Sequence, residues 1–431
     1  MSTFLTVGMT HHEAPLPALE QVAAGPSALA ELQATALASG CAEILLLSTC
    51  SRIELHAVVD DPAAPDPGSA HGEAHDQASA FAHDVAELLG KALVGHIGDR
   101  VGPVATSVGA DAVRHLFRVA AGLDSRIFGE VEVQAQLRTA IRGAKAAHGE
   151  PHRLRHLVTA AVASARETAR DHPSLLRRGL LAERAAALAP ISGSPGGPAE
   201  VVVVGAGAMG RQVVAALRDR GCRVALLSRT SSARSSCGPT VLPLEELATR
   251  LPTADAVFVA TSAGRRLLSS AAVAEAVAGR EERPLTIVDL ALPRNVDPLV
   301  GGVPGVRLLN LDDLSDAACR PVPYGPAVVE VEAAIGAAAD AYCARIRSRR
   351  VGPLVSALQA HLQSLCLEQL RRTTRGHQLP EDVLTRMASA VAGAVGHGPT
   401  VLAREAAGDD DQATLAVLAA AFRLQDVTAA G

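Results

Sequence analysis

The amino-acid sequence predicts a multidomain α/β protein, and three observations lead to that fold class. A chain of 431 residues has room for about two to four domains. From the four valines at 201–204 to about residue 315, strand-like and helix-like segments alternate, which is typical of a parallel sheet covered by helices. The chain before this region mixes strands and helices less regularly, and the chain after residue 326 has helical spacing. We therefore expect an N-terminal α+β domain, a parallel α/β domain and an all-helical C-terminal domain.

The N-terminal domain is predicted from short apolar runs separated by polar turns. The expected elements are a strand at 3–8, helical spacing at 15–40, a buried strand at 44–47, a continuation or partner strand at 53–59, and mostly helix from 80 to about 188. Residues 60–79 are rich in Pro, Gly, Asp and His, and this composition predicts a mobile loop within the domain.

The clearest boundary is the Gly-, Pro- and Ser-rich segment 191–198. Residues 327–350 contain no proline and predict a long helix, which Gly352 and Pro353 kink or interrupt. We divide the chain into a first domain at 1–155, a helical connector at 156–195, a parallel α/β domain at 196–320 and a helical region at 321–431.

Composition limits the compartment and the partners. Seven scattered cysteines without a C-x-x-C pair favour a reducing cytoplasm over a disulfide framework or a zinc ribbon. No apolar run is long enough to cross a bilayer, and the first residues lack the pattern of a secretory signal. A net charge of −5 argues against a sequence-blind DNA or RNA binder, so any RNA contact must use a local basic patch.

A candidate nucleophile lies at the end of the apolar run 44–47. In extended chain, Cys50, Arg52 and Glu54 would share one face. An arginine beside a thiol stabilises the nucleophilic thiolate, and the same guanidinium could instead hold a substrate carboxylate at two points. The alternative from this segment alone is that Cys50 is a small buried hydrophobe at a strand end.

A dinucleotide site is predicted where the four valines lead into G-x-G-x-x-G and an apolar helix. Gly205 allows the tight turn, Gly207 lets the backbone approach a pyrophosphate, and Gly210 lets the helix pack on the strand. This is the Rossmann-type arrangement. The residues expected to bind the cofactor here are Gly205, Ala206, Gly207, Ala208, Met209 and Gly210.

The end of the second strand indicates which dinucleotide is bound. It carries Ser228, Arg229 and Thr230 in place of the carboxylate that usually holds an NAD ribose. An arginine among hydroxyl groups suits a 2′-phosphate, so we predict NADP(H); the alternative for Arg229 is a solvated surface arginine. Asp289, at a later strand end, is a functional carboxylate or a turn residue, and the sequence does not separate the two.

Several motifs together resemble one family, the glutamyl-tRNA reductases, which begin the C5 route to tetrapyrroles. In chain order they are Thr10-His11-His12-Glu13-Ala14-Pro15, Ser48-Thr49-Cys50-x-Arg52-x-Glu54, the segment 115–125 with Gly129-Glu130, the segment 289–298, the segment 311–314 and the segment 396–401. The first of these is similar to the family's Asn-His-Lys-Thr-Ala-Pro. The matches run in the right order over nearly the whole chain.

The resemblance implies a two-step reduction. The Cys50 thiolate would attack the glutamate esterified to its tRNA, giving a thioester and free tRNA, and NADPH would reduce the thioester to glutamate-1-semialdehyde. It also implies a V-shaped homodimer, with a long spinal helix and a helical dimerisation domain near 327–350 and beyond. Glutamyl-tRNA is the implied substrate, and glutamate-1-semialdehyde aminomutase is a candidate partner.

The family pattern also implies residue roles. His115 would assist Cys50 as an acid/base or as polar support; without the resemblance, a structural histidine at the head of an apolar helix is the simpler interpretation. The residues implied to hold the glutamyl group are Thr49, Ser51, Arg52, Ser125, Glu130, Val131, Glu132 and Gln136.

The chain departs from the family pattern in three of these motifs and in one further segment. Ser51 replaces the usual Asn, the family's Lys-Thr is His12-Glu13, and the family's Pro-Gln after Gly-Glu is Val131-Glu132. Glu132 would place a negative charge near a carboxylate-bearing substrate. Residues 168–180 match the family poorly.

Two other functions fit parts of the sequence. One is an NADP-dependent oxidoreductase of the shikimate-dehydrogenase type, which needs neither a cysteine nucleophile nor tRNA. The other is a non-catalytic relative that binds glutamyl-tRNA or the next enzyme of the pathway.

Two surface features are interpreted separately. The basic positions most suited to tRNA, which a solvated helix face explains nearly as well, are Arg138, Arg142, Lys145, Arg153 and Arg155. Three histidines spaced four apart at 148–156 are interrupted by Pro151 and lack a completing carboxylate, so we expect no metal site.

Overall fold

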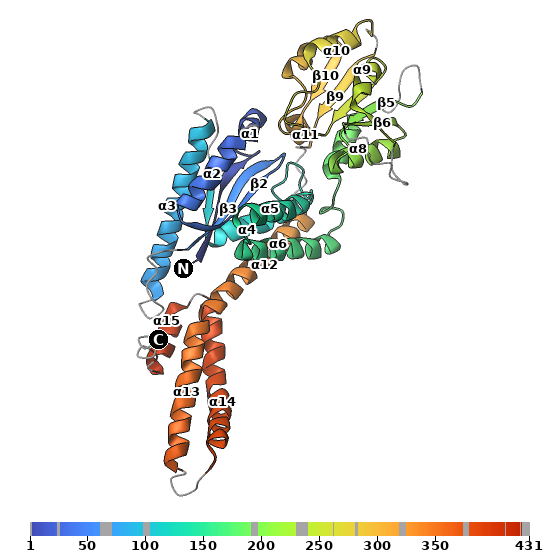
Figure 1. Ribbon diagram of the computed structural model, residues 1–431. Coiled ribbons are helices and arrows are strands. Elements are labelled where there is room, and N and C mark those ends of the chain that lie inside the picture. Colours follow the sequence, from blue (N-terminus) through green and yellow to red (C-terminus); the bar gives the residue numbers. More distant parts are fainter. Residues whose placement is uncertain are drawn as a thin grey trace.

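The computed structural model describes residues 2–23, 26–60, 71–97, 104–190, 197–229, 240–261, 263–280, 283–318, 325–373, 379–409, 411–422 and 424. The N-terminal domain lies between the parallel-sheet domain, at the upper right of Figure 1, and a helical tail that extends downward. These three parts confirm the predicted fold class. Within the described residues, none of the helices has the length and apolar character that crossing a membrane requires.

The N-terminal domain is built on a four-stranded antiparallel sheet in the order β2-β3-β1-β4. Its strands are β1 (Ser2–Thr10), β2 (Cys41–Ser48), β3 (Arg52–Asp60) and β4 (Ala105–Val108). Because β2 and β3 pair as a hairpin, the segment expected at 53–59 is the partner of the buried strand. The hairpin turn carries Cys50.

Helices cover both faces of this sheet. One face is covered by α1 (Leu16–Ala23), α2 (Pro26–Ala38) and α3 (His71–Ile97). The other face is covered by α4 (Ala110–Ala120), α5 (Val133–His148) and α6 (His152–Asp171). Since β3 is buried on both faces, its residues Arg52, Glu54 and His56 lie inside the domain.

Two sequence expectations for this domain were wrong. Residues 71–79 were predicted as loop but form the first turns of α3, because the prolines end at residue 67 and helix-forming Ala, Glu and Gln follow. Strand β4 lies within a region predicted to be helical. Its four residues are too few to show a clear alternation, and the pairing with β1 is what makes them a strand.

The second domain is a six-stranded parallel sheet in the order β10-β9-β8-β5-β6-β7. Its strands are β5 (Glu200–Val204), β6 (Arg223–Ser228), β7 (Val241–Pro243), β8 (Ala256–Val259), β9 (Leu285–Asp289) and β10 (Val306–Leu309). The valines of β5 alternate between two cores. Val201 and Val203 pack with α7 (Leu180–Ala187) and α8 (Ala208–Asp219), whereas Val202 and Val204 face the other layer.

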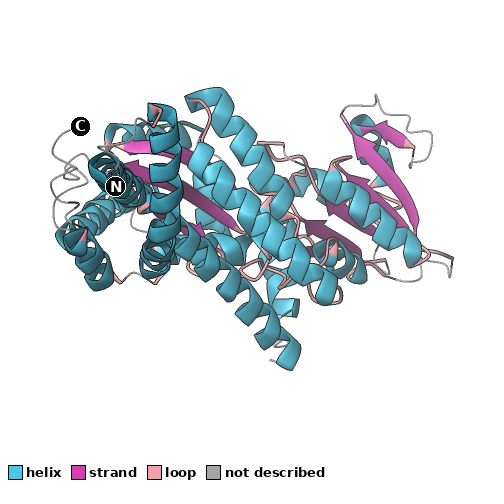
Figure 2. Ribbon diagram, turned by 90° about the horizontal axis from the view of Figure 1, so that it is seen from below, coloured by secondary structure: helices cyan, strands magenta, loops and turns pink. Residues whose placement is uncertain are grey.

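The opposite layer of the second domain is made of short elements. They are η1 (Leu244–Glu246), α9 (Leu247–Arg250), α10 (Ser270–Val277) and η2 (Pro298–Gly302). Helix α11 (Leu311–Ala318) follows the last strand and packs beside α7. Figure 2 shows the two groups of strands as separate sheets with helices between them.

The C-terminal region is helical among its described residues. Its helices are α12 (Pro326–Arg350), α13 (Gly352–Thr373), α14 (Glu381–Gly408) and α15 (Gln412–Ala421). Helix α12 packs on α4 and α6, where Tyr342 and Phe117 enter the same core. Helices α13 and α14 then form an extended hairpin that points away from both sheets (Figure 1).

Candidate active site

Cys50 lies in the three-residue turn between β2 and β3, and it is partly exposed. The Thr49 N–H donates to the Arg52 carbonyl over 2.9 Å, and the Ser51 N–H donates to Thr49 Oγ1 over 3.1 Å. Directly after the neighbouring strand β1, the His11 N–H donates to the Ser51 carbonyl over 2.8 Å. The Cys50 Sγ lies 3.8 Å from Ser51 Oγ. The turn therefore presents the thiol from a backbone that is fixed on both sides.

Arg52 is only 1% exposed and is held by protein groups. Its guanidinium donates to Glu54 Oε1 over 3.1 Å and to the carbonyl of Asp124. The predicted alternation holds for Arg52 and Glu54, which share a face, but Cys50 lies in a turn and not in extended chain. In this structure Arg52 links the strand after Cys50 to the loop that begins at Gly122.

Glu54 is the centre of a buried polar network. Its Oε1 lies 2.9 Å from His115 Nε2, and its Oε2 lies 3.3 Å from His56 Nε2. Burial alone would raise the pKa of Glu54, but the charges of Arg52 and His115 outweigh it and hold this pKa well below 4.5. Burial lowers the pKa of His56, so that ring is neutral. The network thus contains one firmly ionised carboxylate.

His115, on α4, is the titratable member of this network. Burial would lower its pKa, but the Glu54 carboxylate 2.9 Å away outweighs that effect, and Asp124 at 3.7 Å adds to it. The pKa of His115 is therefore raised above 6.5. His115 also lines a cavity of about 160 Å³, together with His12 and Glu13, which follow β1, and residues of β1 and β4. His115 can therefore hold a proton near neutral pH.

The residues after α4 form a scaffold that holds the start of α7. Ser125 Oγ donates to the Glu130 carbonyl over 3.2 Å, and the Glu130 carboxylate accepts the N–H groups of Gly179 and Leu181 at 3.3 and 2.8 Å. These bonds hold the start of α7. Burial raises the pKa of Glu130 despite them. Val131 is buried in the core and Gln136 is partly buried on α5.

Glu132, the charged departure from the family pattern, has a partner in the other domain. Its carboxylate accepts a hydrogen bond from the side-chain amide of Gln212 on α8 over 2.5 Å. The negative charge expected near the substrate is therefore directed at the helix that follows the glycine turn.

Two residues beside the Cys50 turn were not singled out from the sequence. His11 is partly buried; burial, His12, Arg126 and Arg52 lower its pKa to about 3, so its ring is neutral. Arg126 donates from Nε to the Cys50 carbonyl over 3.0 Å. His11 belongs to the motif at 10–15 and could have been found there, whereas no sequence pattern marks Arg126.

The glycine turn after β5 has the shape expected of a phosphate cradle. Gly205 has a φ of 116°, and a Cβ there would lie 2.3 Å from the Ala260 carbonyl oxygen. A Cβ on Gly210 would lie 1.8 Å from the Gly205 carbonyl oxygen, whereas Gly207 faces open space at the start of α8. The backbone is closed on the sheet side and open where a pyrophosphate would lie, so the residues present fit a dinucleotide.

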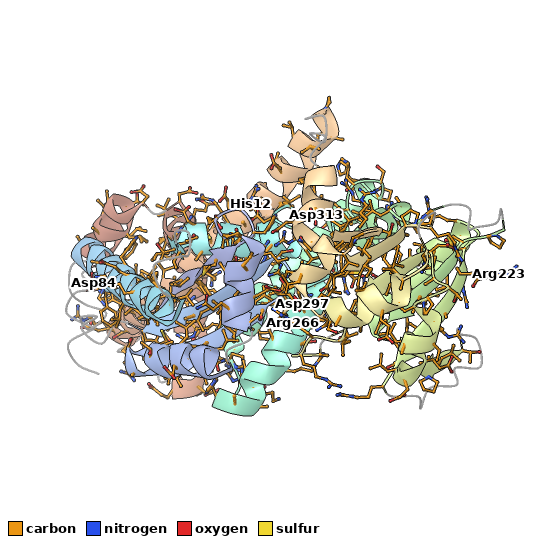
Figure 3. All side chains as sticks on the ribbon, turned by 90° about the horizontal axis from the view of Figure 1, so that it is seen from above. His12, Asp84, Arg223, Arg266, Asp297 and Asp313 are labelled. Atoms are coloured by element: carbon orange, nitrogen blue, oxygen red, sulfur yellow. The ribbon has the colours of Figure 1, made fainter. Side chains whose placement is uncertain are left out.

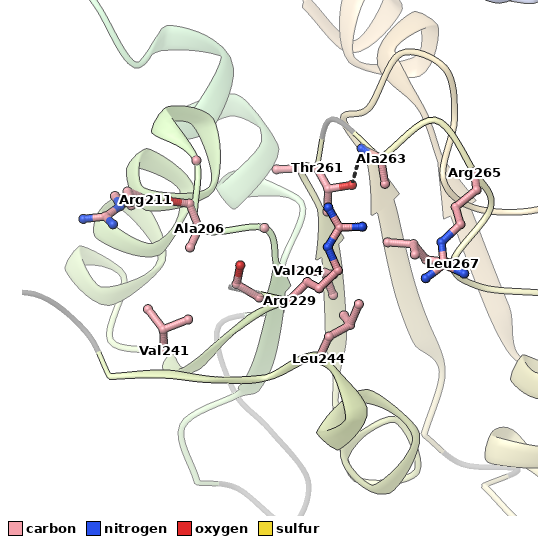
Figure 4. A pocket seen from close by; sticks show the side chains of 14 residues that line it. Val204, Ala206, Arg211, Arg229, Val241, Leu244, Thr261, Ala263, Arg265 and Leu267 are labelled. Carbon is pink, nitrogen blue, oxygen red and sulfur yellow. Dashed lines mark hydrogen bonds between the residues drawn. The ribbon is translucent and has the colours of Figure 1, made fainter. Parts of the chain in front are cut away.

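A cavity of about 410 Å³ adjoins this turn. Three arginines line it, namely Arg211, Arg229 and Arg265, and Figure 4 shows the Arg229 side chain reaching across it. Ser228 lines the cavity too, whereas Thr230 lies outside the described residues. The sequence pointed to Arg229 but missed Arg211 and Arg265.

Arg265 lies in the loop that follows β8. Residues that follow β9 hold this loop in place. Asn295 Nδ2 donates to the Ala263 and Arg265 carbonyls over 2.6 and 2.9 Å, and Arg266 pairs with Asp297 at 3.4 Å (Figure 3). Asp289 accepts the N–H groups of Ala291 and Val296, and burial raises its pKa to about 6. Its contacts in this structure are those of a turn residue.

Polar contacts join the N-terminal domain to the parallel-sheet domain near the Cys50 turn. Arg294, beyond β9, pairs with Glu20 of α1 at 2.5 Å, and Arg126 pairs with Asp312 of α11 at 2.6 Å. Cys50 itself packs against the apolar cluster that contains Val201 and Val203. Cys50 therefore lies on the side of its domain that faces the dinucleotide domain.

The fold and these two sites define an oxidoreductase with a dinucleotide-type domain and a cysteine presented by a separate domain. Residues 7–171 match the model of the glutamyl-tRNAGlu reductase N-terminal domain, and residues 330–424 match that of the glutamyl-tRNAGlu reductase dimerisation domain. Residues 194–317 match the shikimate / quinate 5-dehydrogenase model.

Full-length relatives agree with these matches. The chain is 34% identical to glutamyl-tRNA reductase 2 of a Nocardioides species, over 98% of this chain and 93% of that protein. It is 32% identical to the glutamyl-tRNA reductase of Salinispora arenicola, over 95% and 90% of the two chains. The chain belongs to the glutamyl-tRNA reductase family. The shikimate-dehydrogenase alternative is not favoured, because that likeness is confined to one domain.

Among solved structures, the chain is similar to the glutamyl-tRNA reductase from Methanopyrus kandleri. Sequence identity is 25%, the alignment covers 94% of this chain and 98% of that chain, and the TM-score is 0.39.

Proposed function

We propose that this protein reduces the glutamyl group of glutamyl-tRNA to glutamate-1-semialdehyde with NADPH, through a thioester on Cys50. This reaction is the first step toward 5-aminolevulinate and the porphyrins. The observation that carries the proposal is the fixed turn that presents a partly exposed cysteine toward the dinucleotide domain. Purified protein should consume one NADPH for each tRNA discharged. Turnover of a free hydroxy acid or ketone in place of glutamyl-tRNA would favour the shikimate-dehydrogenase alternative.

The chemistry divides between the two sites. The Cys50 sulfur forms a bond to the acyl carbon, the ester C–O bond breaks, and the leaving ribose oxygen needs a proton. His115, whose pKa is raised, is the group that would supply it. When bound, NADPH supplies the hydride that converts the thioester to the aldehyde and frees the thiolate. The glycine turn would hold the pyrophosphate, and Arg229 would hold the 2′-phosphate.

Replacing Arg229 by alanine tests the choice of cofactor. A charge-assisted contact to a phosphate contributes about 1.5–3 kcal/mol, so KM for NADPH should rise about tenfold to a hundredfold. KM for NADH should change little, because NADH has no 2′-phosphate. Steady-state kinetics with both cofactors would measure this, and an equal loss for both would refute the role of Arg229.

The basic surface that would hold tRNA differs from the one expected from the sequence. Lys145 and Arg155 both pair with Glu150, and Arg153 pairs with Glu43 and Asp60, so each of these cations already has a carboxylate partner. Arg138 and Arg142 of α5 remain in a basic group with Arg166 of α6 and Arg178 of the loop that follows α6. This group, the α5–α6 arginine patch, consists of Arg138, Arg142, Arg166 and Arg178, and burial and mutual repulsion lower the pKa of its central member Arg138.

Replacing Arg166 and Arg178 by glutamine should weaken tRNA binding at low salt and reduce its salt dependence. Each lost phosphate contact lowers the slope of log K against log salt by about 0.7–0.9. Filter binding of glutamyl-tRNA at several salt concentrations measures the slope. The matched control is Arg155→Gln, which removes a cation already paired with Glu150. If the control and the double variant weaken binding equally, the patch is not the tRNA surface.

A homodimer is proposed through the C-terminal helices, whose residues match a dimerisation-domain model. Met387, Val391 and Val395 are spaced four apart on α14 and are 43–55% exposed. Such a stripe of apolar side chains along a long helix suits a second copy of the same surface.

A further inference from the structure

We propose that Arg126 and Asp312 form a positioning pair that ties the Cys50 turn to the dinucleotide domain. In this arrangement, the rate at which Cys50 accepts an acyl group depends on a residue of the other domain. The inference rests on the proposed role of Cys50 and adds to it a coupling between two domains.

Arg126 has the geometry of a bridge. Its side chain is 3% exposed and lies in the loop between α4 and α5. Nε donates to the Cys50 carbonyl over 3.0 Å, and Nη1 donates to Asp312 Oδ1 over 2.6 Å. One planar guanidinium therefore donates hydrogen bonds both to the backbone carbonyl of Cys50 and to the carboxylate of Asp312 on α11. A lysine could not make both bonds in this fixed fork geometry.

Asp312 is the counter-charge that lets Arg126 be buried. A buried guanidinium without an anionic partner is strongly unfavourable. Asp312 also binds the N-terminal domain a second time, because its Oδ2 accepts the Leu16 N–H at the start of α1 over 3.3 Å. The carboxylate is 42% exposed, so its replacement leaves no large cavity. A substitution at Asp312 can therefore remove the bridge without disturbing the folding of the core.

The bond from Arg126 to the Cys50 carbonyl acts on the nucleophile directly. The hydrogen bonds from Thr49 and His11 fix the residues on either side of Cys50. The Cys50 carbonyl is oriented by Arg126, and rotation of this peptide plane changes the direction of the Cys50 side chain. Loss of the bridge should therefore misplace the sulfur while leaving the substrate surface in place.

The test uses glutamyl transfer to Cys50 without NADPH, measured in single turnovers of the full-length protein with labelled glutamyl-tRNA. Arg126→Met should lower the rate at saturating tRNA at least about tenfold, with the half-saturating tRNA concentration unchanged. Asp312→Ala should lower it several-fold. The double variant should be no slower than Arg126→Met, because both substitutions remove the same connection.

The control is Glu20→Ala, which breaks another ion pair between the same domains without touching the Cys50 turn. It should acylate at the parental rate. The proposal is overturned if Asp312→Ala acylates as fast as the parent, if the two losses add, or if Glu20→Ala is equally slow. Absence of label on Cys50 in the parent would instead refute the proposed function.

A second variant separates the loss of the two-point contact from misfolding. Arg126→Lys keeps a positive charge near Asp312, so it should fold with a melting temperature close to the parent. It should still acylate more slowly than the parent and faster than Arg126→Met. Parental acylation by Arg126→Lys would show that the two-point geometry is not required.

Discussion

Replacing Cys50 by serine should abolish reduction of glutamyl-tRNA and leave tRNA binding within about twofold of the parent. A serine hydroxyl is far less ionised than a thiol, and an oxygen ester accepts hydride less readily than a thioester. Binding should persist because the α5–α6 arginine patch is separate from the turn. Semialdehyde production and filter binding, measured on the same preparation, report the two effects.

The matched control for this prediction is Cys366→Ser on α13. Cys366 is a free cysteine with a similar partial exposure, but it lies in the helical tail. Full activity is expected for that variant. Reduction by Cys50→Ser at the parental rate would show that the thioester mechanism is wrong.

Replacing Glu54 by glutamine should cost about 3–5 kcal/mol of stability, because Arg52 would remain buried beside an uncharged partner. Since the pKa of Glu54 is depressed in the folded state, its contribution is present above about pH 4.5 and is lost as the pH falls through the folded pKa. The difference between parent and variant in urea unfolding should therefore narrow in acid. An unchanged stability at pH 7 would contradict the network described here.

The same substitution should change the pH dependence of activity. Glu54 raises the pKa of His115 above 6.5, so cationic His115 persists to higher pH in the parent, and the variant should lose activity at a lower pH. Glu54→Asp is the control, because it keeps the charge. If Glu54→Gln and the parent lost activity at the same alkaline pH, His115 would not be the group whose protonation limits the rate.

The parts of the fold that could be predicted from the sequence are those with a local signal. Four valines followed by G-x-G-x-x-G predict a buried parallel strand, a tight turn and a helix, and the structure has all three. Strand β4 could not be predicted, because it exists through its pairing with β1 about one hundred residues earlier. The start of α3 was hidden by the proline-rich stretch that precedes it.

The residues of the candidate site also fall into those marked by a local motif and those brought together only by the fold. Cys50, His115 and the glycine turn stand in recognisable motifs, and the structure places Glu54 between Arg52 and His115 as the link. The bridge from Arg126 to Asp312 joins residues 186 positions apart. Glu132 looked like a charge directed at substrate, but its partner Gln212 is 80 positions away. Contacts of this length depend on the folded arrangement of two domains.

The most direct measurement is mass spectrometry of the intact protein, and of its Cys50 peptide, after incubation with glutamyl-tRNA in the absence of NADPH. The account predicts that one glutamyl group is added to Cys50, that Cys50→Ala acquires none, and that adding NADPH removes the group as semialdehyde. An unmodified Cys50 peptide together with NADPH-dependent reduction, or a glutamyl group on another cysteine, would contradict it.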